Sequence, residues 1–201
     1  MYMTDPAFFT TPDGISFVRV STPYRQIFDV PEYWIQDIRP DDRVIDIGAN
    51  VGAFCIRAAR HSRSVTAVEP VTTRILEENV RLNAVAVRVI EGALGNGGSI
   101  TVSWDDSFAN VPGYSLAEII QMAGGCDFLK CDCEGAEWLI RSGDLDNVRR
   151  IEMELHLPPI SGPPVMSLLD YISRDFDFEI TRIPCHDALG VMGVLHACRK
   201  V

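Results

Sequence analysis

The densest group of ionisable side chains in the sequence is the stretch DFLKCDCEGAEW, residues 127–138. It carries Asp132, Glu134 and Glu137 close together. Carboxylates this near to one another raise each other's pKa, so the group needs a cationic partner. A sulfonium or ammonium group of a ligand, a metal ion or Lys130 would each serve. A second interpretation stays open, because acidic residues in the first turn of a helix complement its dipole without any ligand.

A histidine follows on the next predicted strand. In IEMELH, residues 151–156, the side chains of Glu152, Glu154 and His156 alternate and therefore share one face. Imidazole titrates near neutral pH, so His156 suits a general base for a hydroxyl group, although a purely structural histidine is the alternative. We expect the catalytic group to be Asp132, Glu134 and His156, with His156 or Asp132 as the base and Glu134 positioning the acceptor. A divalent metal on Asp132 and Glu134 is compatible with the sequence but is not predicted by it.

A glycine loop precedes these groups. In VIDIGANVGAF, residues 44–54, Asp46 ends a predicted strand, and Gly48 and Gly52 leave room for a ligand against the backbone. The spacing differs from the G-x-G-x-x-G pattern of pyrophosphate-binding loops. Asn50 tolerates left-handed backbone, and its amide both donates and accepts, which suits an amino acid moiety. A tight turn without a ligand is the alternative.

The next predicted strand also ends in a carboxylate. Glu69, followed by Pro70, is placed to bind both hydroxyls of an adenosine ribose and would repel a 2′-phosphate. Further on, the small Ala93 in EGALG, residues 91–95, is placed to border an adenine ring. We therefore expect Asp46, Gly48, Asn50, Gly52, Glu69, Pro70 and Ala93 to bind an unphosphorylated adenosine cofactor. A surface glutamate before a proline is the alternative for Glu69.

The elements that must position these residues alternate between strand and helix, which is typical of a parallel sheet. We expect a seven-stranded sheet whose last two strands form an antiparallel hairpin, because the loop between residues 176–183 and 191–199 is too short for a parallel crossover. The expected helices include residues 53–61 and 136–141. An extra extended segment is expected at residues 99–104. Residues 1–40 are rich in aromatic side chains and are expected to cap the strand ends or to pack against the flank of the sheet.

Six stretches resemble the FkbM family of S-adenosylmethionine-dependent methyltransferases in order and approximate spacing. They are VIDIGANVG, VTAVEP, NVRLN, SLAEII, DFLKCDCEGAEWLI and IEMELH. The resemblance implies a three-layer, Rossmann-like class I methyltransferase fold in α/β architecture, with the last strand antiparallel, and S-adenosylmethionine as cofactor. It further implies that the glycine loop holds the methionine and ribose end of the cofactor, that Glu69 binds the ribose hydroxyls, and that Asp132 and Glu134 face the methyl group.

Members of the FkbM family are typically O-methyltransferases, so the resemblance implies a hydroxyl acceptor on a small molecule, sugar or glycan. The alternatives are a protein or RNA methyltransferase, a non-catalytic domain that binds an adenosine cofactor, and a nicotinamide enzyme. No N-P-P-[YF] element follows the fourth strand, which disfavours methylation of an amide or base nitrogen. The N-terminal and C-terminal parts shape substrate choice, so the resemblance does not identify the acceptor.

Composition limits the partners and the setting. The 201 residues predict a single domain, with a cap segment at 1–40 and a cofactor-binding core at 41–201. A net charge of −10 and the lack of a basic patch argue against a nucleic-acid partner. The chain has no apolar run of the roughly 18 to 20 residues that a membrane span needs, and no export signal at its start. These features predict a cytoplasmic enzyme without a membrane span, and they leave the oligomeric state undetermined.

Overall fold

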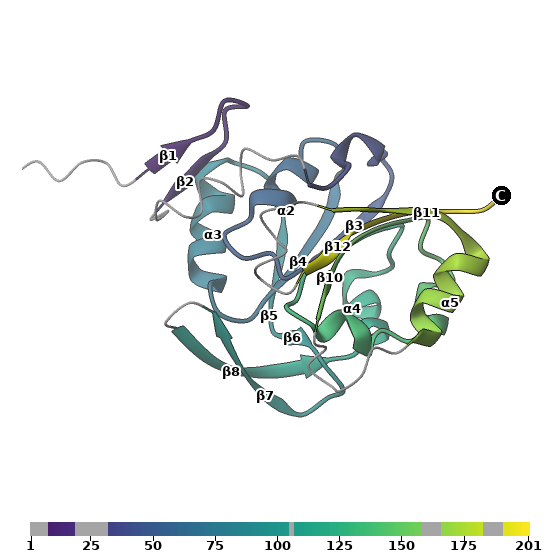
Figure 1. Ribbon diagram of the computed structural model, residues 1–201. Coiled ribbons are helices and arrows are strands. Elements are labelled where there is room, and N and C mark those ends of the chain that lie inside the picture. The colour runs from purple at the N-terminus through teal and green to yellow at the C-terminus, as the bar shows by residue number, and fades with distance from the viewer. Residues whose placement is uncertain (1–7, 19–31, 105–106, 158–165, 183–190) are drawn as a thin grey trace, which may run out of the picture.

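The computed structural model describes residues 8–18, 32–104, 107–157, 166–182 and 191–201 (Figure 1). Its main sheet has seven strands in the order β11-β12-β10-β9-β3-β4-β5. Their bounds are β3 Arg43–Ile47, β4 Ser64–Glu69, β5 Arg88–Glu91, β9 Phe128–Cys131, β10 Arg150–His156, β11 Phe176–Thr181 and β12 Val191–Arg199.

The direction of the strands confirms the predicted fold class. Strands β5, β4, β3, β9 and β10 pair in parallel, whereas β12 is antiparallel to both of its neighbours, β10 and β11. The central strand β3 is buried from Val44 to Ile47, as expected for a strand covered on both faces. The carboxyl ends of β3, β4, β9 and β10 lie at one edge, where open α/β sheets bind their ligands.

Helices cover both faces of the sheet and give the three layers (Figure 1). Helices α2 (Ala53–Ala58) and α3 (Thr73–Leu82) contribute to one apolar core, and α4 (Leu116–Ala123) and α5 (Met166–Asp175) contribute to the other. Local sequence explains the clear limits of α4. Ser115 and Glu118 form a capping box at its start, and Gly124 ends it in a left-handed conformation.

The helix predicted at residues 136–141 is instead a short 3-10 helix, η2 (Ala136–Leu139), and a second one, η3 (Ser142–Leu145), follows it. The side chain of Glu137 explains the difference. Its carboxylate accepts hydrogen bonds from the backbone N–H groups of Gly135, at 2.9 Å, and of His156, at 2.6 Å. The turn is therefore tied to the end of β10, and the chain does not continue as an α-helix.

The extra extended segment predicted at residues 99–104 is one arm of a hairpin. Strand β7 (Ser99–Trp104) pairs antiparallel with β8 (Ser107–Tyr114), and β8 pairs with the short β6 (Ala93–Leu94). This three-stranded sheet follows β5 in the chain and is separate from the main sheet. It lies beside the ligand-binding edge because β6 continues from the end of β5 with only Gly92 between them.

The N-terminal residues take both of the positions considered for them. Strands β1 (Phe8–Thr10) and β2 (Ser16–Val18) form a hairpin that packs on α3, where Asn79 accepts a hydrogen bond from the Val18 N–H. Residues 32–38, which include the 3-10 helix η1 (Ile35–Asp37), instead cross towards the ends of β9 and β10. Part of the expected cap, with Tyr24 and Phe28, lies outside the described residues.

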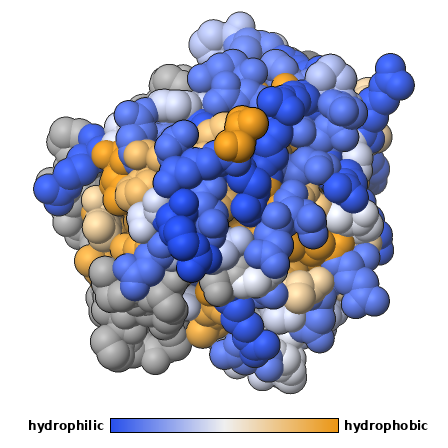
Figure 2. Space-filling view, turned by 90° about the vertical axis from the view of Figure 1, so that its right-hand side faces the viewer, coloured by the Kyte–Doolittle hydropathy of each residue, from blue (hydrophilic) through white to orange (hydrophobic). Residues whose placement is uncertain are grey.

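Within the ranges given above, no helix is both long and apolar enough to cross a bilayer. Figure 2 shows the side of the molecule that lies at the right in Figure 1: it is mostly hydrophilic, and its apolar areas are separated by polar residues.

Candidate active site

The loop after β3 is shaped by a close approach of two backbone segments. Gly48 has a φ of 72°, and a Cβ added to it would lie 1.7 Å from the carbonyl oxygen of Asp132. The Asp132 N–H in turn donates a hydrogen bond to the Ile47 carbonyl, at 3.0 Å. Only glycine fits at position 48, and the contact brings the glycine loop directly against the acidic turn after β9.

Asn50 and Glu69 connect the first two strand ends. Asn50 is left-handed, with a φ of 49°, and its N–H donates to the Glu69 carboxylate at 2.8 Å. Glu69 also accepts from the N–H groups of Val71, at 2.7 Å, and Thr72, at 2.8 Å. A carboxylate offers about four lone-pair positions. These three bonds leave about one acceptor position for a ligand, whereas the sequence suggested that Glu69 could bind both ribose hydroxyls.

A cavity of about 610 Å³ lies at this edge of the sheet. Its volume is within the usual range for a site that holds a small ligand. Five of the predicted cofactor-binding residues line it: Gly48, Asn50, Glu69, Pro70 and Ala93. Asp132 and Glu134 also line the cavity, at the other side of the glycine loop. Residues of β7 form a further wall, which the sequence did not indicate.

Two predicted cofactor-binding residues do not line the cavity. Asp46 is fully buried, and its carboxylate lies 3.1 Å from the ammonium group of Lys130. Gly52 begins α2 in a left-handed conformation, with the side chains of Leu76 and Ile56 directly beside it. Both residues therefore support the glycine loop from the protein interior and do not face the cavity.

Lys130 is one cation that balances the acidic stretch. Its Nζ donates a hydrogen bond to the Gly48 carbonyl at 2.9 Å and lies 3.6 Å from the Asp132 carboxylate. Burial disfavours the ionised form of Asp132, but the charges of Lys130 and His156 outweigh it and keep the pKa of Asp132 below its ordinary value. The pKa of Lys130 is raised, because Asp46 and Asp132 outweigh the effect of its burial.

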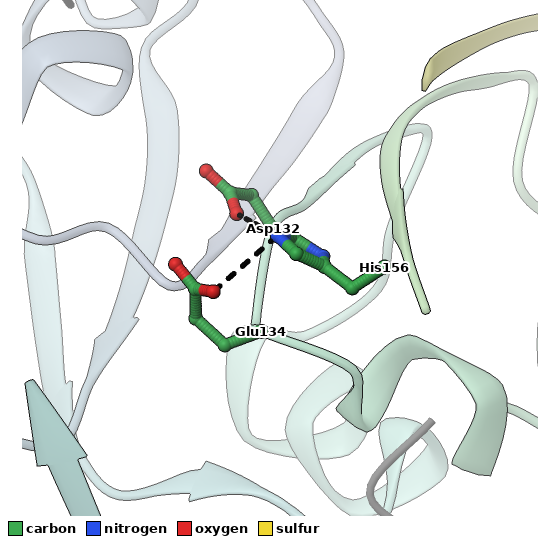
Figure 3. Close-up of side chains that lie close together, drawn as sticks. All are labelled: Asp132, Glu134 and His156. Carbon is green, nitrogen blue, oxygen red and sulfur yellow. Dashed lines mark ion pairs between the residues drawn. The ribbon is translucent and has the colours of Figure 1, made fainter. Parts of the chain in front are cut away.

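The structure brings the three predicted catalytic side chains together (Figure 3). His156 Nε2 lies 3.4 Å from a Glu134 oxygen and 3.9 Å from an Asp132 oxygen. Two contacts hold the end of β10 in this position. The Glu137 carboxylate accepts from the His156 N–H, and Trp138 Nε1 donates to the His156 carbonyl at 2.8 Å. Glu137 is fully buried and therefore acts as a structural support of the site.

The charges around His156 change its titration. Burial lowers the pKa of the imidazole, but the Glu137 carboxylate, 3.3 Å from Nδ1, together with Asp132 and Glu134, raises it to about 9. Burial and the charge of Asp132 raise the pKa of Glu134, whose side chain is 55% exposed. In this arrangement His156 is protonated at neutral pH, so the near-neutral titration expected from its residue type does not hold.

Two residues near Asp132 were not singled out as catalytic from the sequence. The Tyr33 hydroxyl donates to Asp132 at 3.1 Å and to Glu154 at 3.4 Å. Burial, followed by the charge of Asp132, raises the pKa of Glu154 to about 9. The alternation in IEMELH already placed Glu154 on the face of His156. Tyr33 gave no such signal, because it is one of many aromatic residues in the N-terminal part.

The sheet order and this edge of the sheet define the class of the protein. A seven-stranded sheet with an antiparallel last strand, a glycine loop after the first parallel strand and a carboxylate at the end of the second make it a class I S-adenosylmethionine-dependent methyltransferase. The comparisons with known proteins agree with this class. A family model, the TRM5/TYW2 methyltransferase domain, matches residues 33–103. The match covers about a third of the chain, including the glycine loop and Glu69.

Solved structures show the same fold at low sequence identity. TYW2 of M. jannaschii, in complex with AdoMet, is 14% identical; the alignment covers 100% of this chain and 90% of that one, with a TM-score of 0.52. A dimethyladenosine transferase of Plasmodium falciparum is 10% identical, with coverage of 87% and 62% and a TM-score of 0.53. A precorrin 8W decarboxylase of Methanobacterium thermoautotrophicum is 16% identical, with 100% of both chains covered and a TM-score of 0.51. A search of curated proteins found no match.

These findings correct the resemblance to the FkbM family. The family model that matches is the TRM5/TYW2 methyltransferase domain, and nothing supports FkbM. The physical reason lies in the motifs themselves. Gly48 is required by the approach of the Asp132 backbone, and Glu137 by the connection to β10. Residues that the fold requires can therefore look like a family signature.

The expectation that no nucleic acid takes part is also wrong, because the comparisons lead to tRNA methyltransferases, TYW2 among them. Net charge was a poor guide. Within the described ranges, six carboxylate residues are buried against two basic ones, so about four of the ten net negative charges lie away from the surface. The buried carboxylates are Asp42, Asp46, Glu69, Glu137, Glu152 and Glu154, and the buried basic residues are Lys130 and Arg150.

Proposed function

We propose that this methyltransferase transfers a methyl group from S-adenosylmethionine to a nucleoside of RNA. The observation that carries the proposal is the match of residues 33–103 to the TRM5/TYW2 methyltransferase domain. The matched segment begins at Tyr33, which contacts Asp132, and contains the loop, Glu69 and most of β7. It therefore includes the predicted cofactor site and one wall of the cavity.

We propose one orientation of the cofactor in the cavity. The amino acid end lies along Gly48 and Asn50, one ribose hydroxyl donates to the remaining acceptor position of Glu69, and the adenine lies between Pro70 and Ala93. The sulfonium group then faces Asp132, where the acidic groups favour its positive charge. The complex of TYW2 with AdoMet supports this use of the shared fold.

The acidic side of the cavity suits a nucleobase and disfavours phosphate. The carboxylates of Asp132 and Glu134 line the cavity and can accept hydrogen bonds from N–H or O–H groups of a nucleoside. The same charges repel the phosphate groups of the backbone. An acceptor base must therefore leave the stack and enter the cavity while its backbone stays outside, as in other enzymes that modify bases.

Methyl transfer from a sulfonium depends mainly on holding the acceptor in line with the methyl group. In our proposal Asp132 and Glu134 orient the acceptor and take its proton, since they are the predicted catalytic carboxylates that line the cavity. His156, held by Glu137 and Trp138, keeps the two carboxylates in place and balances their charge. This assignment makes His156 a positioning residue.

A second candidate function is O-methylation of a small-molecule hydroxyl. The acidity of the cavity favours it, because an uncharged or cationic small acceptor enters such a site without the repulsion that RNA phosphates meet. The two candidates share the cofactor, the cavity and the carboxylates. They differ only in which molecule receives the methyl group.

The test is methyl incorporation from S-[methyl-³H]adenosylmethionine into tRNA purified from cells and into tRNA transcribed in vitro. We expect acid-precipitable label that disappears on treatment with ribonuclease. Glu134→Gln should lower the rate by about 100-fold or more, the usual size of a lost acid–base group. Glu179→Gln, at an exposed site on β11, should leave it unchanged. Label that appears only in small hydroxyl compounds, with none in RNA, would establish the second candidate instead.

A further inference from the structure

We propose that Asp132, Glu134 and His156 form a binding site for a divalent transition-metal ion, such as Mn²⁺, beside the cofactor cavity. Carboxylate oxygen is a preferred ligand of Mn²⁺, and imidazole nitrogen is a common ligand of first-row transition metals. The site goes beyond the proposed function, since methyl transfer to a nucleoside does not require a metal. Three protein ligands would leave coordination positions open for an acceptor or for water.

The distances from His156 to the two carboxylates are in the range found between two ligands of one ion. One donor atom from each residue lies within 4.8 Å of the other two. His156 Nε2 is 3.4 Å from Glu134 and 3.9 Å from Asp132, which is longer than a hydrogen bond of about 2.7–3.2 Å. Two ligands that each lie about 2.1 Å from one ion are separated by about 3–4 Å. Figure 3 shows the three side chains converging on one point.

An independent observation comes from the imidazole. The His156 side chain is only 8% exposed, and its Nε2 lies 3.4 Å from Glu134 and 3.9 Å from Asp132, both longer than an ordinary hydrogen bond. Buried polar atoms normally have a close partner, so the long distances at Nε2 call for an explanation. Nε2 points at Asp132 and Glu134, so an ion bound there would satisfy it (Figure 3).

The surroundings of His156 are those of a metal-binding histidine. The Glu137 carboxylate lies 3.3 Å from Nδ1, on the side of the ring opposite the cluster. A histidine ligand commonly donates its second ring N–H to a carboxylate, and the metal takes the place of the proton on the other nitrogen, which is released to solvent. Glu137 also binds the N–H groups of Gly135 and His156, so it holds together the two segments that carry the ligands.

Charge favours a cation at this point. Asp132, Glu134 and Glu137 surround the single imidazole of His156. Lys130, the other nearby cation, lies 3.6 Å from Asp132 but is shared with Asp46 and the Gly48 carbonyl, both of which are closer to it. Glu134 is 55% exposed, so an ion can enter from solvent. Once bound, a divalent ion would polarise an acceptor oxygen or nitrogen and ease the loss of its proton.

The experiment uses Mn²⁺ alone, with the full chain freed of metal by a chelator and then dialysed. Electron paramagnetic resonance measures free Mn²⁺ during a titration. We expect one saturable site per chain. Glu134→Gln and His156→Gln should each weaken binding by at least about tenfold, the lower limit seen even for second-sphere changes. Glu179→Gln serves as the matched control, because it removes an exposed carboxylate far along the edge strand β11.

Two results would overturn the site. One is the absence of saturable Mn²⁺ binding by the unaltered chain, and the other is equal binding by Glu134→Gln and Glu179→Gln, which would place the ion elsewhere. Should His156→Gln fail to fold, Glu134→Gln decides, because its side chain is half exposed. The titration contains neither RNA nor methyl donor, so its outcome is separate from that of the labelling experiment.

Discussion

The hydroxyl group of Tyr33 donates a hydrogen bond to the carboxylate of Asp132, at 3.1 Å, across 99 positions of sequence. The ring lies edge-on against Phe54 in α2, with centroids 5.8 Å apart, and Lys130 Nζ lies 5.3 Å from the ring centre. The N-terminal segment thus reaches the point where the glycine loop meets the acidic turn. Tyr33 is therefore a candidate for a residue that positions Asp132.

Replacement of Tyr33 by Phe tests this role. The variant keeps the ring packing but removes the donor to Asp132, and a hydrogen bond to a charged group is worth about 1.5–3 kcal/mol. We expect kcat to fall by about tenfold or more, while the affinity for S-adenosylhomocysteine stays within about twofold, because Tyr33 does not line the cofactor cavity. A purely structural role for the hydroxyl would instead lower the thermal midpoint and leave kcat unchanged.

Gly48→Ala tests the contact between the loop and the acidic turn. An added Cβ would lie 1.7 Å from the Asp132 carbonyl oxygen, and the φ of 72° is itself unfavourable for alanine. The loop must move, so we expect S-adenosylhomocysteine to bind at least about tenfold more weakly in calorimetry. Gly14→Ala also changes a left-handed glycine, but its Cβ would meet nothing within 4 Å and Gly14 does not line the cavity, so this variant reports backbone strain alone. Equal affinities in the two variants would contradict the proposed role of the contact.

The attachment of the N-terminal hairpin predicts a stability effect at Asn79. This fully buried side chain accepts from the Val18 N–H and donates to the Val51 carbonyl, each at 2.8 Å. Asn79→Ala leaves both backbone groups without that partner. We therefore expect the free energy of unfolding, measured with urea, to fall by about 2–4 kcal/mol. Glu77→Gln, on the exposed side of α3, should change stability by less than about 0.5 kcal/mol. Equal losses in the two variants would show that Asn79 does not anchor the hairpin.

The ion pair between Arg43 and Asp127 predicts a pH dependence. Hydrogen bonds from Arg43 hold the pKa of Asp127 below its ordinary value of 3.8. A lowered pKa stabilises the fold above the unfolded-state pKa, and the effect is lost as the pH falls through the folded-state pKa. Asp127→Asn should therefore have a lower free energy of unfolding than the unaltered chain at about pH 6. Between about pH 6 and about pH 3, the free energy of unfolding should fall less in the variant than in the unaltered chain. Parallel pH profiles of the two proteins would contradict the role of the pair.

The sequence predicted the main sheet because short β-rich runs alternate with helical patterns along the chain. The antiparallel hairpin of β11 and β12 followed from a short connection. The second arm of the β7–β8 hairpin was not predicted, since β8, with Pro112 and Gly113 near its end, lacks a strong strand pattern. The helix predicted at residues 136–141 failed because the side chain of Glu137, rather than local propensity, determines the path of that turn.

The candidate site was predictable to a similar extent. Residues that end strands, such as Glu69 and Asp132, share one edge of a parallel sheet, and this placed them together. The separation of lining residues from supporting ones was not predictable. Asp46 and Gly48 are two positions apart, yet one lies buried against Lys130 and the other lines the cavity. The shifted pKa of His156 depends on Glu137, whose contact with it is a property of the folded chain.

In our proposal the cavity holds S-adenosylmethionine with its sulfonium group facing Asp132. The affinities for S-adenosylmethionine and S-adenosylhomocysteine, taken as a ratio, test this placement. The first ligand carries the sulfonium charge and the second does not. Calorimetry compares the unaltered chain with Asp132→Asn, in buffer containing a chelator. The variant should lose at least about fivefold in its preference for the charged ligand, because close charges at a protein surface interact by about 1 kcal/mol or more. Its affinity for S-adenosylhomocysteine should change little. An unchanged ratio would place the sulfonium group away from Asp132 and contradict the account.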